Sequence, residues 1–383
     1  MFRYIFAAIC IILAITYLAA RSVNIDEAEA PLYEEPRIVN FIYNDSLVYS
    51  LTFADFGVEY YFHLFWFDEE LIAERLDVVR AQAAILPVNA SMRLDISGEF
   101  IITDGVPGRT PDMQNAAVQL REILASGEGG TVVLDMYEIP PSYHAGHFAM
   151  AQSLLGRFVT PYHGGEEIPR SINIRLAAAH INNTVLFPGQ VFSTRETAGP
   201  STPERGYAMA AVIMDGQLVE DYGGGVCQVA STLYNAVLYA ELPVLERSNH
   251  SVKVYYMDFG FDAAIAGDYM DLKFKNNLEY PILITASAVN GILEVKIYGR
   301  ETRPANRTLA FVSELVEVIP PEPERVVVDE NLPSGHVLVS TEPRDGYKYE
   351  LFRVVFVDGE QMERERVNTS VYRPIQGVIT RGP

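Results

Sequence analysis

Cys227, His250 and Asp262 have the residue types, in chain order, of a thiol nucleophile, its base and the group that orients the base. Cys227 is the second residue of a helical pattern that begins directly after three glycines, in the stretch GGGVCQVAS. The N-terminus of a helix stabilises a thiolate, which is the nucleophilic form of cysteine. His250 and Asp262 follow at the entrances of two expected strands. We therefore predict all three as catalytic residues.

Backbone groups next to Cys227 could serve the same chemistry. Glycine allows close backbone approach, and the first N–H groups of a helix have no partner inside the helix. Such N–H groups could hold the oxyanion that forms during acyl transfer. We predict Gly224, Gly225 and Gln228 as substrate-binding or oxyanion residues.

A second interpretation makes Cys227 a small apolar residue where a tight turn meets the core. On a helical projection the cysteine flanks an apolar stripe and does not lie at its centre. The stripe consists of Val226, Val229, Ala230, Leu233, Val237 and Ala240. A non-catalytic binding or scaffold protein therefore stays open beside a thiol enzyme.

The first residues carry an export signal. Tyr4–Ala20 has no charged residue and follows Arg3, which is typical of a signal peptide or a signal anchor. We expect residues 4–20 to contact the membrane and the remainder to lie outside the cytoplasm. The exported part then contains a single cysteine, Cys227, which favours a reactive or an intermolecularly paired thiol.

Charge and ligand spacing exclude several partners. The formal net charge of −21 would repel a phosphate backbone, so we expect no nucleic acid. His144 and His147 have the spacing of metal ligands, but no third ligand is suitably placed. We predict no metal site and no cofactor.

Patterning predicts a multidomain α+β protein with an N-terminal membrane segment. We expect a signal segment at 1–22, a linker at 23–36, an α+β domain at 37–168 and a second α+β domain at 169–299. Residues 300–383 alternate between apolar and polar, after a Pro-rich linker, and predict a small all-β module.

Several motifs in order resemble the VanW domain of bacterial cell-surface proteins. They are LFPGQVFS, AGPSTPERGYAMAAVIMDGQLV, GGGVCQVASTLYNAVLYAELPVLERSNHS and DLKFKNNLEYPI. The domain before them resembles the peptidoglycan-binding domain that commonly precedes VanW, and the tail is similar to a β module found beside VanW in cell-wall proteins. The resemblance implies a bacterial cell-envelope protein, related to glycopeptide resistance, whose partner is peptidoglycan or another wall polymer.

The same motifs add two expectations about the site. Arg205 and Tyr207 belong to one of them and could line the cleft of Cys227, or equally form a structural set of ion pairs. The order of cysteine, helix, histidine and aspartate resembles the core of transglutaminase-like thiol enzymes. The function expected is a thiol acyl transferase or hydrolase acting on peptidoglycan peptides through Cys227, with a non-catalytic wall-binding or scaffold protein as the alternative.

Overall fold

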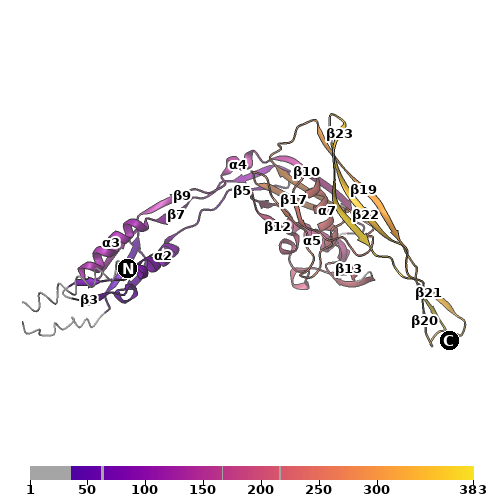
Figure 1. Cartoon of the computed structure of the whole chain (residues 1–383), viewed down its shortest axis with the longest axis horizontal. Coiled ribbons are helices and arrows are strands. Elements are labelled where there is room, and N and C mark those ends of the chain that lie inside the picture. Colours follow the sequence, from indigo (N-terminus) through magenta and orange to yellow (C-terminus); the bar gives the residue numbers. More distant parts are fainter. Residues whose placement is uncertain (1–35, 62–63, 166, 215–216) are drawn as a thin grey trace, which may run out of the picture. The chain divides into compact units, whose positions relative to one another are not determined.

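The computed structural model describes residues 36–61, 64–165, 167–214 and 217–383, which form two compact units (Figure 1). The first unit contains the described residues up to Pro87 together with Pro107–Pro140. The second contains Val88–Val106 and Pro141–Pro383. The expected signal segment at 1–22 and nearly all of the linker at 23–36 lie outside the described residues.

The first unit packs two helices against a small sheet. Its strands β2, β1 and β8 are adjacent in that order, with β1 antiparallel to β2 and parallel to β8. Asp68 and Asp112 cap the helices α2 and α3, since each carboxylate accepts two backbone N–H groups. The elements are β1 (Ile38–Tyr43), β2 (Ser46–Thr52), η1 (Phe53–Phe56), β3 (Glu59–Tyr61), β4 (Leu64–Trp66), α2 (Glu69–Ala83), β7 (Gly108–Pro111), α3 (Met113–Ser126), β8 (Gly130–Val133) and β9 (Met136–Ile139).

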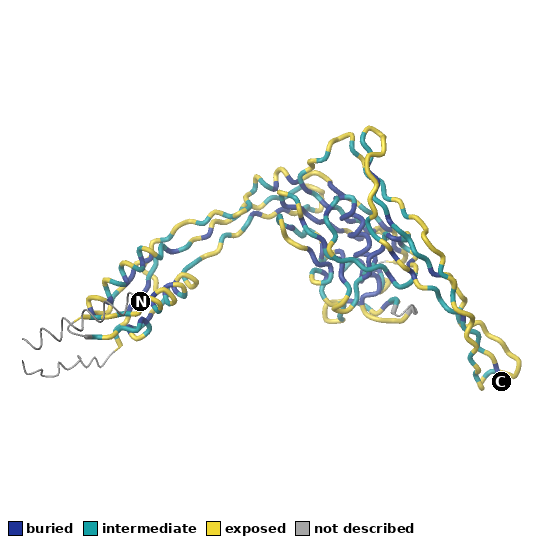
Figure 2. Tube along the Cα trace, viewed as in Figure 1, coloured by how far each residue is buried: buried dark blue, intermediate teal, exposed yellow. Residues whose placement is uncertain are grey.

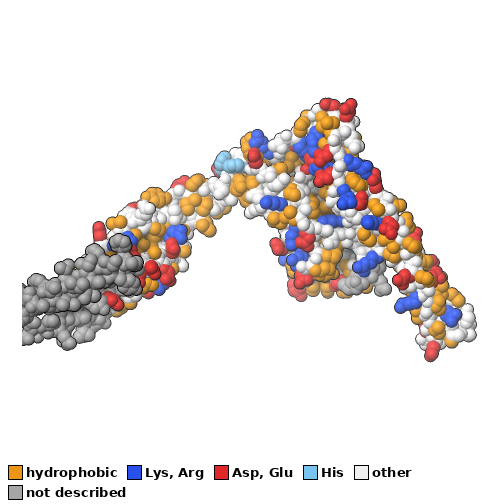
Figure 3. All heavy atoms as spheres, viewed as in Figure 1, with side chains coloured by type: hydrophobic (Ala, Val, Ile, Leu, Met, Phe, Trp, Pro, Cys, Tyr) orange, Lys and Arg blue, Asp and Glu red, His pale blue; other side chains and the backbone are white. Residues whose placement is uncertain are grey.

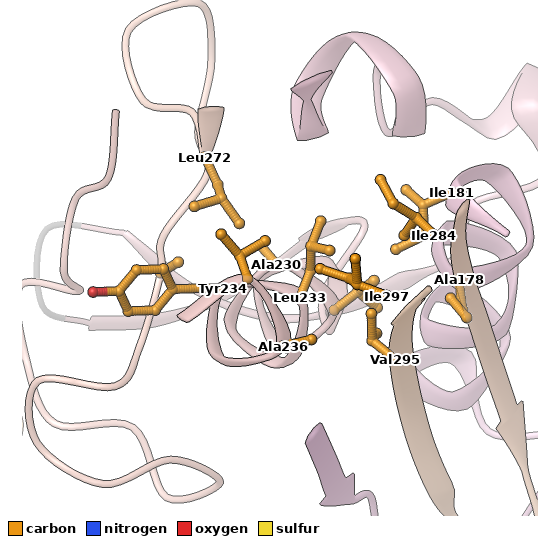
Figure 4. Packing of buried hydrophobic residues seen from close by; sticks show 14 of the residues in the cluster. Ala178, Ile181, Ala230, Leu233, Tyr234, Ala236, Leu272, Ile284, Val295 and Ile297 are labelled. Carbon is orange, nitrogen blue, oxygen red and sulfur yellow. The ribbon is translucent and has the colours of Figure 1, made fainter. Parts of the chain in front are cut away.

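The second unit is built on an antiparallel sheet in the order β10-β18-β17-β11, against which α5 and α7 pack. Leu233 of α7 lies against Val295 and Ile297 of the sheet (Figure 4). Its main elements are β10 (Ser153–Pro161), α5 (Pro169–Ile181), β11 (Thr184–Leu186), α7 (Val226–Tyr239), β17 (Ile282–Val289) and β18 (Ile292–Gly299). Buried residues are concentrated along α7 and these strands (Figure 2).

Smaller elements surround this core. Strands β13 and β14 form an antiparallel hairpin, and β12, β16 and β15 form a small sheet. Their bounds are β5 (Ser91–Leu94), β6 (Phe100–Thr103), α4 (Ala145–Ala149), β12 (Val191–Ser193), α6 (Thr194–Ala198), η2 (Pro203–Arg205), β13 (Met209–Met214), β14 (Gln217–Tyr222), β15 (Val244–Glu246) and β16 (Lys273–Lys275).

The C-terminal residues form two further sheets, β19-β22-β23 and β20-β24-β21. Acidic and basic side chains are mixed over the longer sheet (Figure 3), where ion pairs such as Arg366–Glu350 join neighbouring strands. The strands are β19 (Arg307–Ile319), β20 (Arg325–Val328), β21 (Val337–Thr341), β22 (Gly346–Val357), β23 (Glu360–Tyr372) and β24 (Val378–Arg381).

The predicted α+β fold class is wrong, because the structure is dominated by strands, with 42% strand against 22% helix. The helical pattern that follows the three glycines correctly predicted α7, and the four longer helices, α2, α3, α5 and α7, have 13 to 15 residues. Strands contain more residues than helices because most other segments pair in sheets or hairpins. Strands β19 and β23 alone have 13 residues each. None of the helices in the described ranges combines the length and apolar character needed to cross a membrane.

The transglutaminase-like core is also not found. That arrangement requires His250 and Asp262 on successive strands, but both lie in an irregular segment between β15 and β16. The expected strand at Val252–Met257 does not form. Isolated bridges such as Ser248 with Ala264 replace a regular ladder there.

The three glycines before α7 allow the chain to enter the helix against other backbone. A Cβ at Gly224 would lie 2.6 Å from the carbonyl oxygen of Ala211, which is shorter than real contacts. Gly225 is the N-cap of α7 with a φ of 114°, in the region that favours glycine. The sequence GGG is therefore explained by close packing and a left-handed turn.

We expect Gly224→Ala to lower the free energy of unfolding by about 1–3 kcal/mol, because β13 or the start of α7 must shift to make room for the methyl group. Urea denaturation followed by circular dichroism measures the change. Gly165→Ala is the matched control, since its Cβ would meet nothing within 4 Å and its stability should be unchanged or raised by up to about 1 kcal/mol. Equal free energies of unfolding for the two variants would contradict the role of close packing at Gly224.

Candidate functional site

His250 and Asp262 form a buried pair in the segment between β15 and β16. The His250 side chain is 8% exposed and that of Asp262 is 1% exposed. Nδ1 of His250 lies 2.7 Å from Oδ2 of Asp262, and the backbone N–H of His250 donates to the same oxygen at 2.7 Å. Two bonds to one carboxylate oxygen fix the imidazole, so that its Nε2 faces the other way.

Cys227 is half-buried at the start of α7, and the side chain of His250 is near enough to lower the pKa of its thiol. The thiol also lies 3.4 Å from the carbonyl oxygen of Ile265, to which it can donate. Burial raises the pKa of Cys227. The hydrogen bond and charge of His250, the backbone of Ile265 and the charge of Arg170 outweigh that effect, so the pKa is lowered.

The pKa of His250 moves in the opposite direction, to about 9. Burial lowers it, but the hydrogen bonds to Asp262 and Cys227 and the charges of both groups raise it. A lowered thiol pKa beside a raised imidazole pKa favours transfer of the thiol proton to the ring. Such a transfer would provide an ionised sulfur nucleophile and a proton on the neighbouring imidazole.

Two further side chains hold the carboxylate of Asp262. Its Oδ1 accepts from the hydroxyl of Tyr372 at 2.6 Å and from Nη2 of Arg247 at 3.2 Å. Nε of Arg247 donates to the backbone oxygen of Asp262 at 2.7 Å. Burial raises the pKa of Asp262, and its partners His250 and Arg247 lower it below the usual value. The acid therefore stays ionised in a place from which water is excluded.

Strand β23 supplies the outer side of this network. The backbone N–H of Gly260 donates to the Tyr372 hydroxyl at 2.8 Å, and Nη1 of Arg247 donates to Ser370 at 2.8 Å. Asn368 donates to the hydroxyl of Tyr234 on α7 at 2.8 Å. The far C-terminal strand is thereby bonded to the segment that carries His250 and Asp262.

The predicted oxyanion residues lie around the entrance to α7. The N–H groups of Val226 and Gln228 donate to the carbonyls of Gly223 and Gly225. The N–H of Cys227 has no acceptor among the hydrogen bonds of the described residues. The side chain of Gln228 is buried and donates to Thr160 and to the carbonyl of Pro161. The backbone N–H groups of Gly224 and Gly225 likewise have no acceptor among the hydrogen bonds of the described residues. The oxyanion roles of Gly224, Gly225 and Gln228 stay predictions.

The side chains of Arg205 and Tyr207 form hydrogen bonds away from Cys227, within the second unit. Both donate to the carbonyl oxygen of Ala198, at 2.9 Å and 3.3 Å. Tyr207 is 3% exposed, and Arg205 also lies 3.4 Å from Nε2 of His180. In the described part of the chain neither residue contacts Cys227, His250 or Asp262, so a substrate-binding role for them stays a prediction.

Sequence reasoning missed two residues beside the thiol. The hydroxyl of Tyr256 lies 3.4 Å from Nε2 of His250. The guanidinium of Arg170 lies 5.6 Å from the ring centres of both Tyr255 and Tyr256. Only the fold brings these residues together, because Arg170 is on α5 and the tyrosines occupy the segment expected to be a strand. Within the described ranges, no group of three potential metal ligands occurs.

Comparison with protein families matches residues 169–298 to "VanW like protein" and residues 312–383 to "G5 domain". Residues 169–298 therefore form a VanW domain. The resemblance expected from the motifs is thus confirmed, and the small β module at its end is a G5 domain. Tyr372 lies in the G5 domain, whereas Cys227, His250 and Asp262 lie in the VanW domain.

Two curated relatives agree with this assignment. "Uncharacterized protein YoaR" of Bacillus subtilis (strain 168) is 36% identical over 172 residues, which cover 45% of this chain and 54% of that protein. "Vancomycin B-type resistance protein VanW" of Enterococcus faecalis (strain ATCC 700802 / V583) is 30% identical over 120 residues, which cover 30% of this chain and 44% of that protein. The chain spans about half the length of the curated relatives it matches.

Two solved structures of G5 domains match 20% of the chain. "IgA1 Protease G5 domain structure" is 28% identical, with 92% of that chain covered and a TM-score of 0.16. "Crystal structure of HP0197-G5" is 23% identical, with 100% of that chain covered and a TM-score of 0.13.

We expect Tyr372→Phe to lower the free energy of unfolding by about 1–3 kcal/mol, because the change removes one hydrogen bond from the buried carboxylate of Asp262 and takes away the acceptor of the Gly260 N–H. Urea denaturation of the full chain measures the loss. Tyr349→Phe is the control, since its ring stacks on Phe259 at 4.2 Å and the substitution keeps that ring. Equal stability of Tyr372→Phe and the wild type would show that β23 does not hold the acid.

Proposed function

We propose that this protein is an extracytoplasmic, cell-wall-associated thiol enzyme that acts on an amide or ester of peptidoglycan peptides. The observation that carries the proposal is the hydrogen bond between His250 and the buried Asp262, together with the effect of His250 on the pKa of the neighbouring Cys227. A nucleophile, a base and an orienting acid in this order are the requirements of thiol acyl transfer.

The VanW domain and the G5 domain support association with the cell wall. One relative is named for resistance to vancomycin. The net charge of −21 disfavours a nucleic-acid substrate. A wall peptide is therefore the substrate class that fits both the domains and the chemistry of the site.

The first half of the proposed reaction forms a thioester. The thiolate of Cys227 attacks the carbonyl carbon, a C–S bond forms, and the carbonyl π electrons move to the oxygen. The free N–H of Cys227 donates to that oxyanion. The imidazolium of His250 then gives its Nε2 proton to the leaving amine or alkoxide as the bond to the carbonyl carbon breaks, and the oxygen regains its double bond.

The second half regenerates the thiolate. Water or an acceptor amine attacks the thioester, and His250 takes one proton from this attacking group. The C–S bond then breaks, and its electron pair stays on sulfur. Water gives hydrolysis, and an amine gives transfer to a new peptide. Asp262 keeps the proton of His250 on Nδ1 in both halves and stabilises the imidazolium.

We expect Cys227→Ser and His250→Gln to abolish turnover of isolated sacculi, with a loss of at least about 100-fold, because each removes a reacting group. Mass spectrometry of the released and retained muropeptides detects the product. His336→Gln is the control, since His336 is exposed on the G5 domain and should leave turnover unchanged. Binding of sacculi without any change in muropeptides by the wild type would favour the wall-binding or scaffold alternative.

The pH dependence follows from the two pKa values. The thiolate forms as pH rises through the lowered pKa of Cys227, and the imidazolium is lost as pH rises through the His250 pKa of about 9. The turnover rate should therefore increase with pH on the acid side, reach a plateau below pH 9 and decrease near pH 9. A rate that starts only at the ordinary thiol pKa, with no alkaline fall, would contradict the ion pair.

A further inference from the structure

The guanidinium of Arg170 contacts Gln228, the residue that follows Cys227, and has no carboxylate partner among the described residues. In the described part of the chain it forms no ion pair, although the protein has 50 acidic residues. Its Nε is buried and has no hydrogen-bond partner. The arginine at the other end of the site, Arg247, is in contrast paired with Asp262. A cation left unpaired in so acidic a protein is available to an anion from outside.

The side chain of Arg170 is nevertheless held in place. Its Nη2 donates to Oε1 of Gln228 at 2.8 Å, and Gln228 is itself fixed by Thr160 and Pro161. The planar cation also lies over the rings of Tyr255 and Tyr256, each at 5.6 Å. Little conformational entropy remains to be lost when a ligand binds such a group.

This position adjoins both the nucleophile and solvent. The charge of Arg170 is felt by Cys227, one residue before Gln228 on α7. On the other side, the neighbouring Tyr255 is 71% exposed. An arginine fork matches a carboxylate in geometry and binds it through charge-assisted hydrogen bonds. A substrate carboxylate could therefore reach Arg170 while its carbonyl carbon reaches Cys227.

We propose that Arg170 is the carboxylate-binding subsite of this enzyme, and that the substrate is a peptide whose scissile bond lies next to a free carboxylate. The inference rests on the proposed function of Cys227 and adds the class of substrate to it. Gln228 and the two tyrosines hold the guanidinium, and Tyr255 forms the exposed edge of the subsite.

Alkylation of Cys227 tests the subsite without knowledge of the natural substrate. Iodoacetate and iodoacetamide react with the thiolate by the same displacement of iodide, but only iodoacetate carries a carboxylate. The rates are measured on the full chain with each reagent, and labelling of Cys227 is read by peptide mass spectrometry. Their ratio cancels any change in the fraction of thiolate, so that it reports contact between the reagent and the cation.

We expect the wild type to prefer iodoacetate and Arg170→Gln to lower the ratio of the two rates by about tenfold, the effect of one lost charge-assisted contact. Arg170→Lys keeps the charge and should retain part of the preference, and it replaces the glutamine variant if that variant fails to fold. Arg157→Gln, which removes a cation from an exposed pair with Glu294, should leave the ratio unchanged.

Two outcomes separate this inference from the function on which it rests. Rates that fall equally with both reagents in Arg170→Gln would overturn the subsite, since Arg170 would then only stabilise the thiolate. Wild-type Cys227 that reacts with iodoacetamide no faster than an ordinary free thiol at neutral pH would instead overturn the proposed thiol chemistry.

Discussion

The site depends on one buried charge, the carboxylate of Asp262. A buried carboxylate that loses its partners costs several kcal/mol, so the groups around it must be held in position by the fold. His250 contributes both its ring and its backbone N–H, Arg247 contributes its guanidinium, and Tyr372 contributes its hydroxyl. The acid in turn sets the orientation and the raised pKa of His250, and the charge of His250 lowers the pKa of Cys227.

Two separate sets of contacts position Cys227 near Asp262. Cys227 is fixed by α7, which is buried against the sheet of β10, β18 and β17 and enters through the close glycine turn. His250 and Asp262 lie in an irregular segment that β23 of the G5 domain holds through Ser370 and Tyr372. The VanW and G5 domains therefore meet at the site, and the G5 strand supports the geometry of the proposed chemistry.

Part of this site could be predicted from the sequence. Cys227, His250 and Asp262 were predicted from their types and order, and the structure joins His250 to Asp262 by a hydrogen bond, with His250 also lowering the pKa of Cys227. Their catalytic roles remain our proposal. The strand expected at Val252–Met257 was wrong because alternation of apolar residues gives a weak preference, which tertiary contacts override. There the side chains of Tyr255 and Tyr256 pack on Arg170 instead of joining a sheet.

Contacts between distant segments could not be predicted in this way. Arg170 and Tyr372 carry no local motif, and only the packing of α5 and β23 brings them to Cys227 and Asp262. The fold class was wrong for a related reason, since helical periodicity is easily recognised in a sequence whereas pairing between distant strands is not. The VanW domain was predicted correctly because its motifs are contiguous and occur in order.

The central claim is that Cys227 is ionised at neutral pH, and its ultraviolet thiolate absorbance tests that claim most directly. The titration compares the full chain with Cys227→Ser, so that the difference reports this thiol alone. The account predicts that the thiolate is already formed at neutral pH and disappears only on acidification. A thiolate signal that appears only near the ordinary cysteine pKa of 9.0 would contradict it.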